Sequence, residues 1–173
     1  MISLSTLCWI IVAIFVLIGA IRGMAKELIV SVSGIFAIFI ITILLPMTNS
    51  NLEGTSLFWV RFGILIASAF FGYQTPNFRL IAESGKMVRH PTRDILFGSI
   101  IGGINGFIFF SSIWYFMAEA NYPFEQITAP NPASETGLAA LEILSRAAPI
   151  ILTAPKIYYA MAGAMGILLV VLI

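Results

Sequence analysis

Five long apolar runs constrain this chain more than any other feature of its sequence. A helix that crosses a membrane needs about 20 mostly apolar residues. The chain is 60% hydrophobic and 10% charged over 173 residues, whereas soluble domains have roughly 45–50% apolar and about 25% charged residues. We therefore expect an all-α fold, a polytopic integral membrane helical bundle with four or five spans in a single membrane domain over residues 1–173. The runs cover residues 4–21, 28–45, 57–73, 95–118 and 157–173.

The first run is expected to be a permanent helix. A secretory signal peptide has a positively charged beginning and ends at a small-x-small cleavage site. The residues before this run carry no Lys or Arg, and no such site precedes the charges Arg22 and Lys26.

Basic residues gather in alternate loops and predict an orientation. Loops 22–27 and 74–94 hold most of them, and short loops rich in Lys and Arg stay in the cytoplasm. We therefore expect the N-terminus outside and both of these loops in the cytoplasm, with their basic side chains against the anionic lipid surface. These residues are Arg22, Lys26, Arg79, Lys86, Arg89 and Arg93.

The long connection between the last two runs contains a pattern typical of an amphipathic helix at residues 137–152. Glu142 and Arg146 can pair at a spacing of four on one face. We expect a short helix in the outer membrane interface, capped by Ser134 or Thr136 and ended or kinked by Pro149. Its apolar face, in lipid or against the bundle, would hold Leu138, Leu141, Leu144, Ala148 and Ile151.

Residues suited to catalysis or metal binding are scarce. The chain has one Cys and one His, which excludes an internal disulfide and a Cys/His metal cluster. The segment Ser84 to Met87 resembles the end of a phosphate loop but lacks its first glycine and the Ser or Thr that follows the lysine. Ser111 and Ser112 have no nearby histidine in the sequence, and we expect them to form hydrogen bonds within or between helices. We predict no enzyme activity, no metal and no catalytic cofactor.

Arg61 is the one basic residue well inside a predicted span. It falls near the outer end of that span, where Glu119 and Glu53 are also expected. An outer ion pair, or an arginine that extends to the headgroups, is the structural explanation. A ligand or ion contact at the mouth of the bundle is the functional alternative.

Glycines recur at a spacing of four along the fourth run. In lipid, helices associate mainly by close van der Waals contact, which small residues four apart allow. We therefore expect a packing groove with Asn105 beside it, able to hydrogen-bond to a neighbouring helix. A bare glycine face also admits a flat ring or an isoprenoid tail, so lipid, quinone or carotenoid contact stays open. The groove residues are Gly98, Gly102 and Gly106, with a shorter version at Gly19 and Gly23.

The fifth run carries further pairs of small residues. They are Ala160 with Ala164 and Ala162 with Gly166. Each pair has the spacing that lets two helices approach closely.

Two segments resemble the CvpA family, the colicin V production protein and its relatives. Residues 21–40 are similar to the family's R-G-hydrophobic-x-x-E hairpin, with Arg22, Gly23 and Glu27 in place and Gly34 in the next span. Residues 92–107 resemble its charged step into a glycine-rich span, although the order of Arg93 and Asp94 is reversed and the acidic residue usual in the first span is absent. The resemblance covers residues 4–120, and a fifth span is an addition to the family pattern.

This resemblance implies a multi-pass protein of the bacterial inner membrane that is tied to colicin V production or export and to envelope homeostasis, without an established catalytic activity. We expect a scaffold or an export-related factor that acts through helix contacts, with lipids and other membrane subunits or further copies of itself as partners. The alternative is an accessory subunit of a large respiratory or photosynthetic complex. A transporter working alone is less favoured, because the sequence lacks repeats and buried charge. A net charge of +1 gives no reason to expect nucleic acid.

Overall fold

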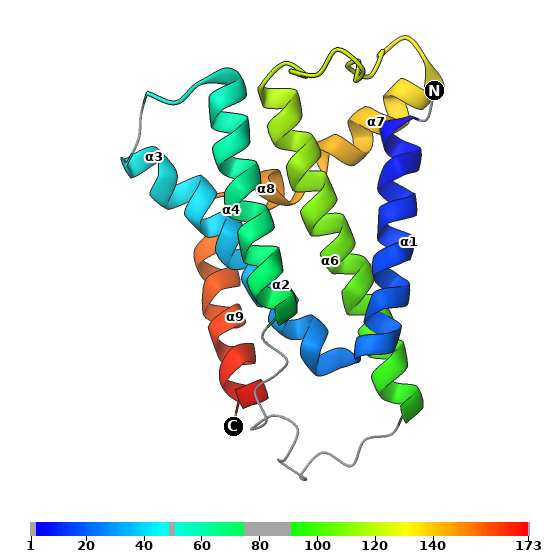
Figure 1. The fold of residues 1–173 in the computed structure, drawn as a ribbon, viewed down its shortest axis with the longest axis vertical. Coiled ribbons are helices and arrows are strands. Elements are labelled where there is room, and N and C mark those ends of the chain that lie inside the picture. The colour runs from blue at the N-terminus through cyan, green and yellow to red at the C-terminus, as the bar shows by residue number, and fades with distance from the viewer. Residues whose placement is uncertain (1–2, 49–50, 75–90, 173) are drawn as a thin grey trace.

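The computed structural model describes residues 3–48, 51–74 and 91–172, and these residues form a helical bundle (Figure 1). The bounds of the helices are α1 Leu4–Arg22, α2 Met24–Phe39, the π-helix η1 Ile40–Leu44, α3 Leu45–Thr48, α4 Gly54–Gln74, α6 Pro91–Glu119, α7 Glu135–Ser145, α8 Ala148–Ile151 and α9 Lys156–Leu172. The predicted all-α fold is confirmed.

Four helices in the described part of the chain are long and apolar enough to cross a membrane. They are α1 with 19 residues, Met24–Thr48 with 25, α4 with 21 and Thr92–Glu119 with 28. At 1.5 Å per residue, each approaches or exceeds the roughly 30 Å of a bilayer's hydrocarbon core. Helices α1, α4 and α6 run roughly along the long axis of the molecule, and Met24–Thr48 crosses it obliquely (Figure 1). We call the end where Gly23 joins α1 to α2 the hairpin end, and the end where α6 stops the Glu119 end.

The second span is one rod with a local defect near its end. Pro46 has no N–H and cannot continue the normal helical hydrogen bonds. The helix widens just before it into the π-helix η1, where the amide of Leu45 bonds to the carbonyl of Ile40. The hydroxyl of Thr42 donates to the carbonyl of Ile38 at 2.7 Å. The rod therefore continues to Thr48 instead of ending at residue 45 as predicted.

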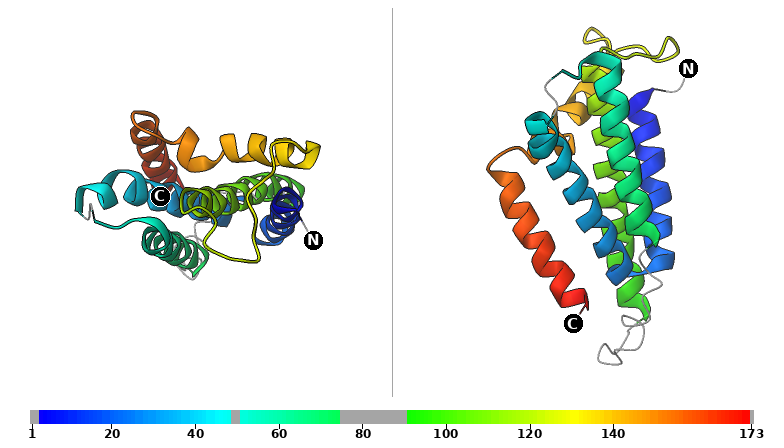
Figure 2. Two further views of the ribbon diagram at one scale, coloured as in Figure 1. Left: turned by 90° about the horizontal axis from the view of Figure 1, so that it is seen from above. Right: turned by 60° about the vertical axis from the view of Figure 1, so that its left-hand side comes forward.

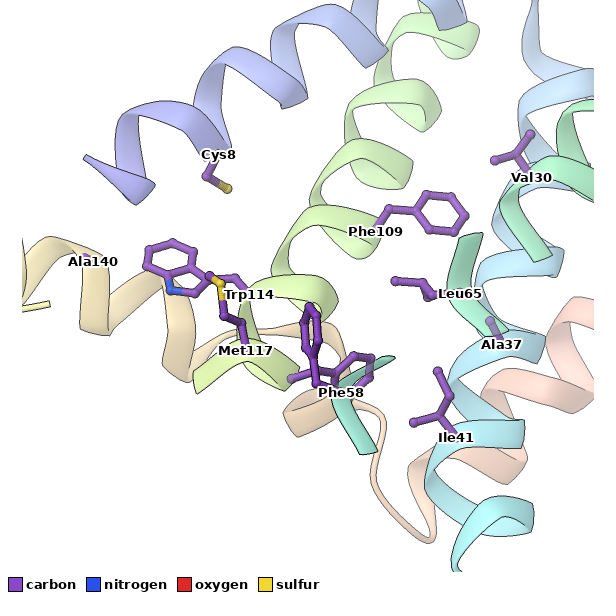
Figure 3. Packing of buried hydrophobic residues seen from close by; sticks show 11 residues of the cluster. Cys8, Val30, Ala37, Ile41, Phe58, Leu65, Phe109, Trp114, Met117 and Ala140 are labelled. Atoms are coloured by element: carbon purple, nitrogen blue, oxygen red, sulfur yellow. The ribbon is translucent and has the colours of Figure 1, made fainter. Parts of the chain in front are cut away.

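Large apolar side chains cover the outside of the bundle as well as its interior. Leu17 is 65% exposed, Ile21 86% and Tyr159 76%. Inside, Trp114 and Phe116 of α6 are buried in a cluster that also draws on α1, α2, α4 and α7 (Figure 3). An exterior this apolar suits lipid, where neighbouring helices gain no hydrophobic advantage over the surrounding chains.

The last third of the chain lies along one side of the bundle. Helix α7 contacts α1 and α6, α8 contacts α6, and α9 contacts α2 (Figure 2). Helix α9 has 17 residues and is shorter than the four candidate spans. The described residues therefore give four spans by length and composition, with α9 as a further apolar helix.

The predicted interfacial helix is partly wrong. Ser134 does cap α7, because its side chain accepts the N–H of Gly137, and Glu142 does pair with Arg146 at 2.8 Å. The helix ends at Ser145, however, and α8 starts separately at Ala148 with Pro149 in its first turn. The face expected in lipid or against the bundle is divided between the two, since Leu138 is 57% exposed and Ala148 is buried. Small residues face the bundle because they allow closer approach, namely Gly137, Ala140, Ala147, Ala148 and Pro149.

Candidate functional site

The glycine face of α6 packs directly against α1. A methyl group on Gly19 or on Gly98 would collide with the backbone carbonyl of the other residue. One on Gly102 would meet the carbonyl of Phe15, and one on Gly106 would meet the Phe15 side chain. The predicted groove is therefore filled by the chain's own first helix. A partner helix, a quinone or a carotenoid would have to bind to another face.

The α1–α2 connection is a single residue. Gly23 has φ +85°, a conformation that side-chain-bearing residues rarely adopt, and a methyl there would strike the Asp94 carboxylate. Asp94 of α6 accepts the N–H of Met24 at 2.9 Å, so that it caps α2 from a different helix and complements the positive end of the helix dipole. The predicted loop 22–27 does not exist as a loop, because Lys26 and Glu27 already lie in α2.

Glu27 is the most unusual side chain in the described structure. It is fully buried, and so is Asn105 of α6. The expectation that the chain lacks buried charge is therefore wrong. The Asn105 amide donates to the Glu27 carboxylate at 2.9 Å and to the Glu27 carbonyl at 3.0 Å. The hydroxyl of Ser31 donates to the Asn105 side-chain oxygen at 2.7 Å. A carboxylate removed from water in this way needs partners of this kind.

Arg22 completes the cluster and joins three helices. Its Nη1 donates to Glu27 Oε1 at 2.8 Å, and its Nη2 donates to the carbonyl of Tyr73 near the end of α4 at 3.2 Å. The guanidinium also lies over the Tyr73 ring, 4.2 Å from its centroid. We define the hairpin cluster as Arg22, Glu27, Ser31, Tyr73 and Asn105.

The sequence predicted a different position for Arg22. It was expected among the cytoplasmic, lipid-facing basic residues, but its side chain is only 16% exposed. The reason is that the ion pair with Glu27 holds it against α2 and α4. Lys26 and Arg93 are exposed at the hairpin end, and the Arg93 guanidinium lies 5.8 Å from the centroid of the Phe97 ring. Arg79, Lys86 and Arg89, with the phosphate-loop-like segment, lie outside the described residues.

The hairpin cluster holds α1, α2, α4 and α6 together. Its carboxylate is neutralised by a guanidinium and hydrogen-bonded on both oxygens, and removing one partner from such a buried pair typically costs about 3–5 kcal/mol. The described residues contain no group of three or more His, Cys, Asp or Glu suited to hold a metal ion. The Tyr73 hydroxyl is the exception within this cluster, since it is buried and has no hydrogen-bond partner among the described residues.

The Glu119 end holds a second charged cluster. The structure brings Arg61 Nη1 and Glu119 Oε2 into an ion pair, and the hydroxyl of Tyr115 donates to Glu119 Oε1 at 3.0 Å. The Arg61 guanidinium lies 5.1 Å from the centroid of the Phe116 ring. Glu53 is exposed and makes no ion pair with Arg61 among the contacts described. The proposed mouth of the bundle therefore contains two of the three predicted residues together.

Beyond the end of α6, Tyr122 folds back on the bundle. The indole N–H of Trp114 donates to its hydroxyl at 3.3 Å. Burial raises the pKa of Tyr122 above its usual 10.0, and the Trp114 hydrogen bond opposes that change in part. The Tyr122 phenol is therefore neutral at physiological pH.

Sequence reasoning missed Glu27, Ser31, Tyr73 and Asp94 as members of a site. A signal was present, because Glu27 stands four residues before Ser31 at the start of a long uncharged run, in reach of Arg22. The polar positions of one helix face were thus visible. Their partner Asn105 was predicted to hydrogen-bond to a neighbouring helix, but the residue that it bonds to was not predicted.

Comparison of the chain with models of protein families, with curated proteins and with solved structures gives no significant match in any of the three.

Proposed function

We propose that this protein is a non-enzymatic integral membrane protein that acts through helix contacts, as a scaffold or an export- and envelope-related factor of the kind that the CvpA-like segments imply. Support comes from the way its polar groups are used. The hairpin cluster and the glycine packing join α1, α2, α4 and α6 to one another. These buried polar groups form hydrogen bonds within the bundle. A protein held rigid in this way is better suited to present a contact surface than to catalyse a reaction.

The observation that carries this proposal is that small residues lie on both faces of α9. Ala164 is buried against the bundle, with Ala160 partly buried. On the outward side, Ala162 is exposed, and a methyl on Gly163 or Gly166 would meet no described atom within 4 Å. Glycine in a helix costs about 1 kcal/mol relative to alanine. A helix that carries two of them on an open face is suited to a close approach by another helix.

The test compares two glycines that are both open in the isolated chain. Gly163→Leu on α9 should weaken the association of the purified protein with its partner subunit, or with its own copies. Gly63→Leu on α4, where a methyl also meets nothing, serves as the matched control. The measurement is the mass of the complex after purification in a mild detergent. Equal behaviour of both variants and the unaltered protein would refute the contact role of α9.

A second candidate is the accessory subunit of a respiratory or photosynthetic complex. The exposed rings of Phe70 on α4 and of Tyr158 and Tyr159 on α9 favour it, because aromatic faces suit a quinone or a carotenoid. An absorption spectrum of the same preparation separates the two candidates. Stoichiometric pigment or quinone would support the accessory subunit, and a protein free of both would support the scaffold.

The proposed location is the bacterial inner membrane, with the N-terminus outside and the hairpin end in the cytoplasm. Exposed Lys26 and Arg93 at that end support this orientation. An impermeant maleimide applied to intact cells should label Asn121→Cys and leave Lys26→Cys unlabelled until the cells are permeabilised. Cys8 is fully buried and gives little background. The reverse pattern would invert the topology.

A further inference from the structure

A groove opens beside the second charged cluster, between α6 and the α7–α8 segment. Its volume is about 390 Å³, within the roughly 300–1,000 Å³ of ordinary ligand sites. The lining comes from both sides of the break between α7 and α8. The Ser111 hydroxyl of α6 accepts the N–H of Ala148 at 3.2 Å and holds α8 against α6. The lining includes Tyr115, Ala118 and Glu119 of α6, with Leu141, Leu144 and Ile150 from α7 and α8.

The groove is apolar along its length and carries one charge. Leu141, Leu144 and Ile150 supply aliphatic surface, and Glu119 is the only charged residue of the lining. The Glu119 side chain stays 40% exposed although it pairs with Arg61. A carboxylate has about four acceptor positions, and the described structure fills two of them with Tyr115 and Arg61. Acceptor capacity therefore remains for a further donor.

The position of the groove along the bundle points to lipid. Trp and Tyr side chains concentrate where a membrane meets water. Tyr115 and Tyr122 lie at this end, and Tyr122 bonds to the buried Trp114. Helix α6 also ends here. A site at this level meets the headgroup of a phospholipid and the first part of its acyl chain.

We propose that this groove binds a phospholipid with a primary ammonium headgroup, of the phosphatidylethanolamine class. The ammonium would donate to the Glu119 carboxylate and to the Tyr115 hydroxyl oxygen, with an acyl chain along Leu144 and Ile150. A primary ammonium has three N–H donors, whereas the quaternary ammonium of a choline lipid has none. A soluble amine would leave the apolar part of the groove empty. An anionic headgroup without an ammonium has no N–H to donate to Glu119, whose charge Arg61 already balances. The free acceptor positions of Glu119 and the apolar lining together therefore favour this class of lipid.

The experiment measures retained lipid. The purified full chain, depleted of lipid, is titrated with phosphatidylethanolamine, phosphatidylcholine or phosphatidylglycerol of identical acyl chains, and bound lipid is counted by native mass spectrometry. We expect the ethanolamine lipid to bind most tightly. Glu119→Gln should weaken its binding about tenfold or more, as the loss of a hydrogen bond to a charged group does.

Glu142→Gln is the matched control, because Glu142 also pairs with an arginine but does not line the groove. It should leave lipid binding unchanged. Two further variants keep the Arg61 pair intact in case Glu119→Gln fails to fold. Tyr115→Phe should weaken ethanolamine-lipid binding by a smaller factor, and Ile150→Trp should fill the groove and lower the retention of all three lipids.

Equal affinity for the three lipids, a preference for phosphatidylglycerol, or equal binding by Glu119→Gln and Glu142→Gln would each overturn the proposal. None of these outcomes depends on a partner subunit, so that the proposed scaffold function is tested separately.

Discussion

The two ends of the bundle each contain an Arg–Glu pair, and the pairs differ in what surrounds the carboxylate. At the hairpin end, Glu27 is fully buried, and its partner Arg22 is 16% exposed. At the Glu119 end, Arg61 is similarly covered at 17%, but Glu119 is 40% exposed. The first carboxylate relies entirely on protein partners, whereas the second can exchange protein contacts for water or a headgroup. The comparison indicates that the hairpin end is built for stability and that the Glu119 end is open to exchange.

The largest expected difference comes from removing each carboxylate in turn. Glu27→Ala leaves Arg22 and Asn105 without their buried partner, and we expect it to lower the free energy of unfolding by about 3–5 kcal/mol. Glu119→Ala should lower it by less, because Glu119 is 40% exposed and water can take its place beside Arg61. Detergent-denaturant titration of the purified variants measures both. Losses of similar size would remove the distinction between the two ends.

The glycine packing between α1 and α6 tests the hairpin end in another way. Gly102→Ala places a methyl against the backbone carbonyl of Phe15, and overpacking of this kind typically costs about 1–3 kcal/mol. Gly63→Ala faces open space and should be neutral or slightly stabilising, since alanine favours the helix. The same titration compares them. A harmless Gly102→Ala would show that the two backbones are not in contact.

Arg22→Lys separates charge from geometry within the hairpin cluster. The lysine keeps a positive charge beside Glu27, but a single ammonium cannot reproduce the fork that reaches both Glu27 and the Tyr73 carbonyl. We expect a loss of about 1–2 kcal/mol, near the value of one hydrogen bond. Thermal unfolding in detergent measures it. A loss as large as that of Glu27→Ala would mean that the connection to α4 dominates the cluster.

The smallest expected effect is that of Tyr73→Phe. The change removes a buried hydroxyl that has no hydrogen-bond partner in the described part of the chain, and it keeps the ring under Arg22. We therefore expect a change within about 0.5 kcal/mol, or a slight gain in stability. A clear loss in the same unfolding experiment would reveal a partner for that hydroxyl.

The spans were predictable from the sequence, because each is a property of consecutive residues. The glycine face of α6 was also predictable, since Gly98, Gly102 and Gly106 lie four residues apart, a spacing that indicates close helix packing. The helix that fills that face was not predictable, because several helices carry small residues that could have matched it.

The hairpin cluster was missed for a different physical reason. A charge at the edge of an apolar run is most simply placed in a loop, and Glu27 and Lys26 are adjacent. One of them is buried and the other exposed, because the helix starts at Met24 and turns Glu27 toward Asn105. The partners lie 78 residues apart, a separation at which no local pattern fixes a contact. The break between α7 and α8 was predictable in part, because Pro149 was expected to end or kink the helix. The contact of Ala148 with Ser111 of α6 was not, because the two residues lie 37 positions apart.

The most direct test of this account is a double-mutant cycle between Glu27 and Asn105. Glu27→Ala, Asn105→Ala and the double variant are unfolded side by side with the unaltered protein. Residues in one buried network show coupling of about 0.5–3 kcal/mol, and we predict a stabilising coupling above 1 kcal/mol, on the order of a charge-assisted hydrogen bond. Additive effects of the two changes would contradict the claim that this bond holds α2 to α6.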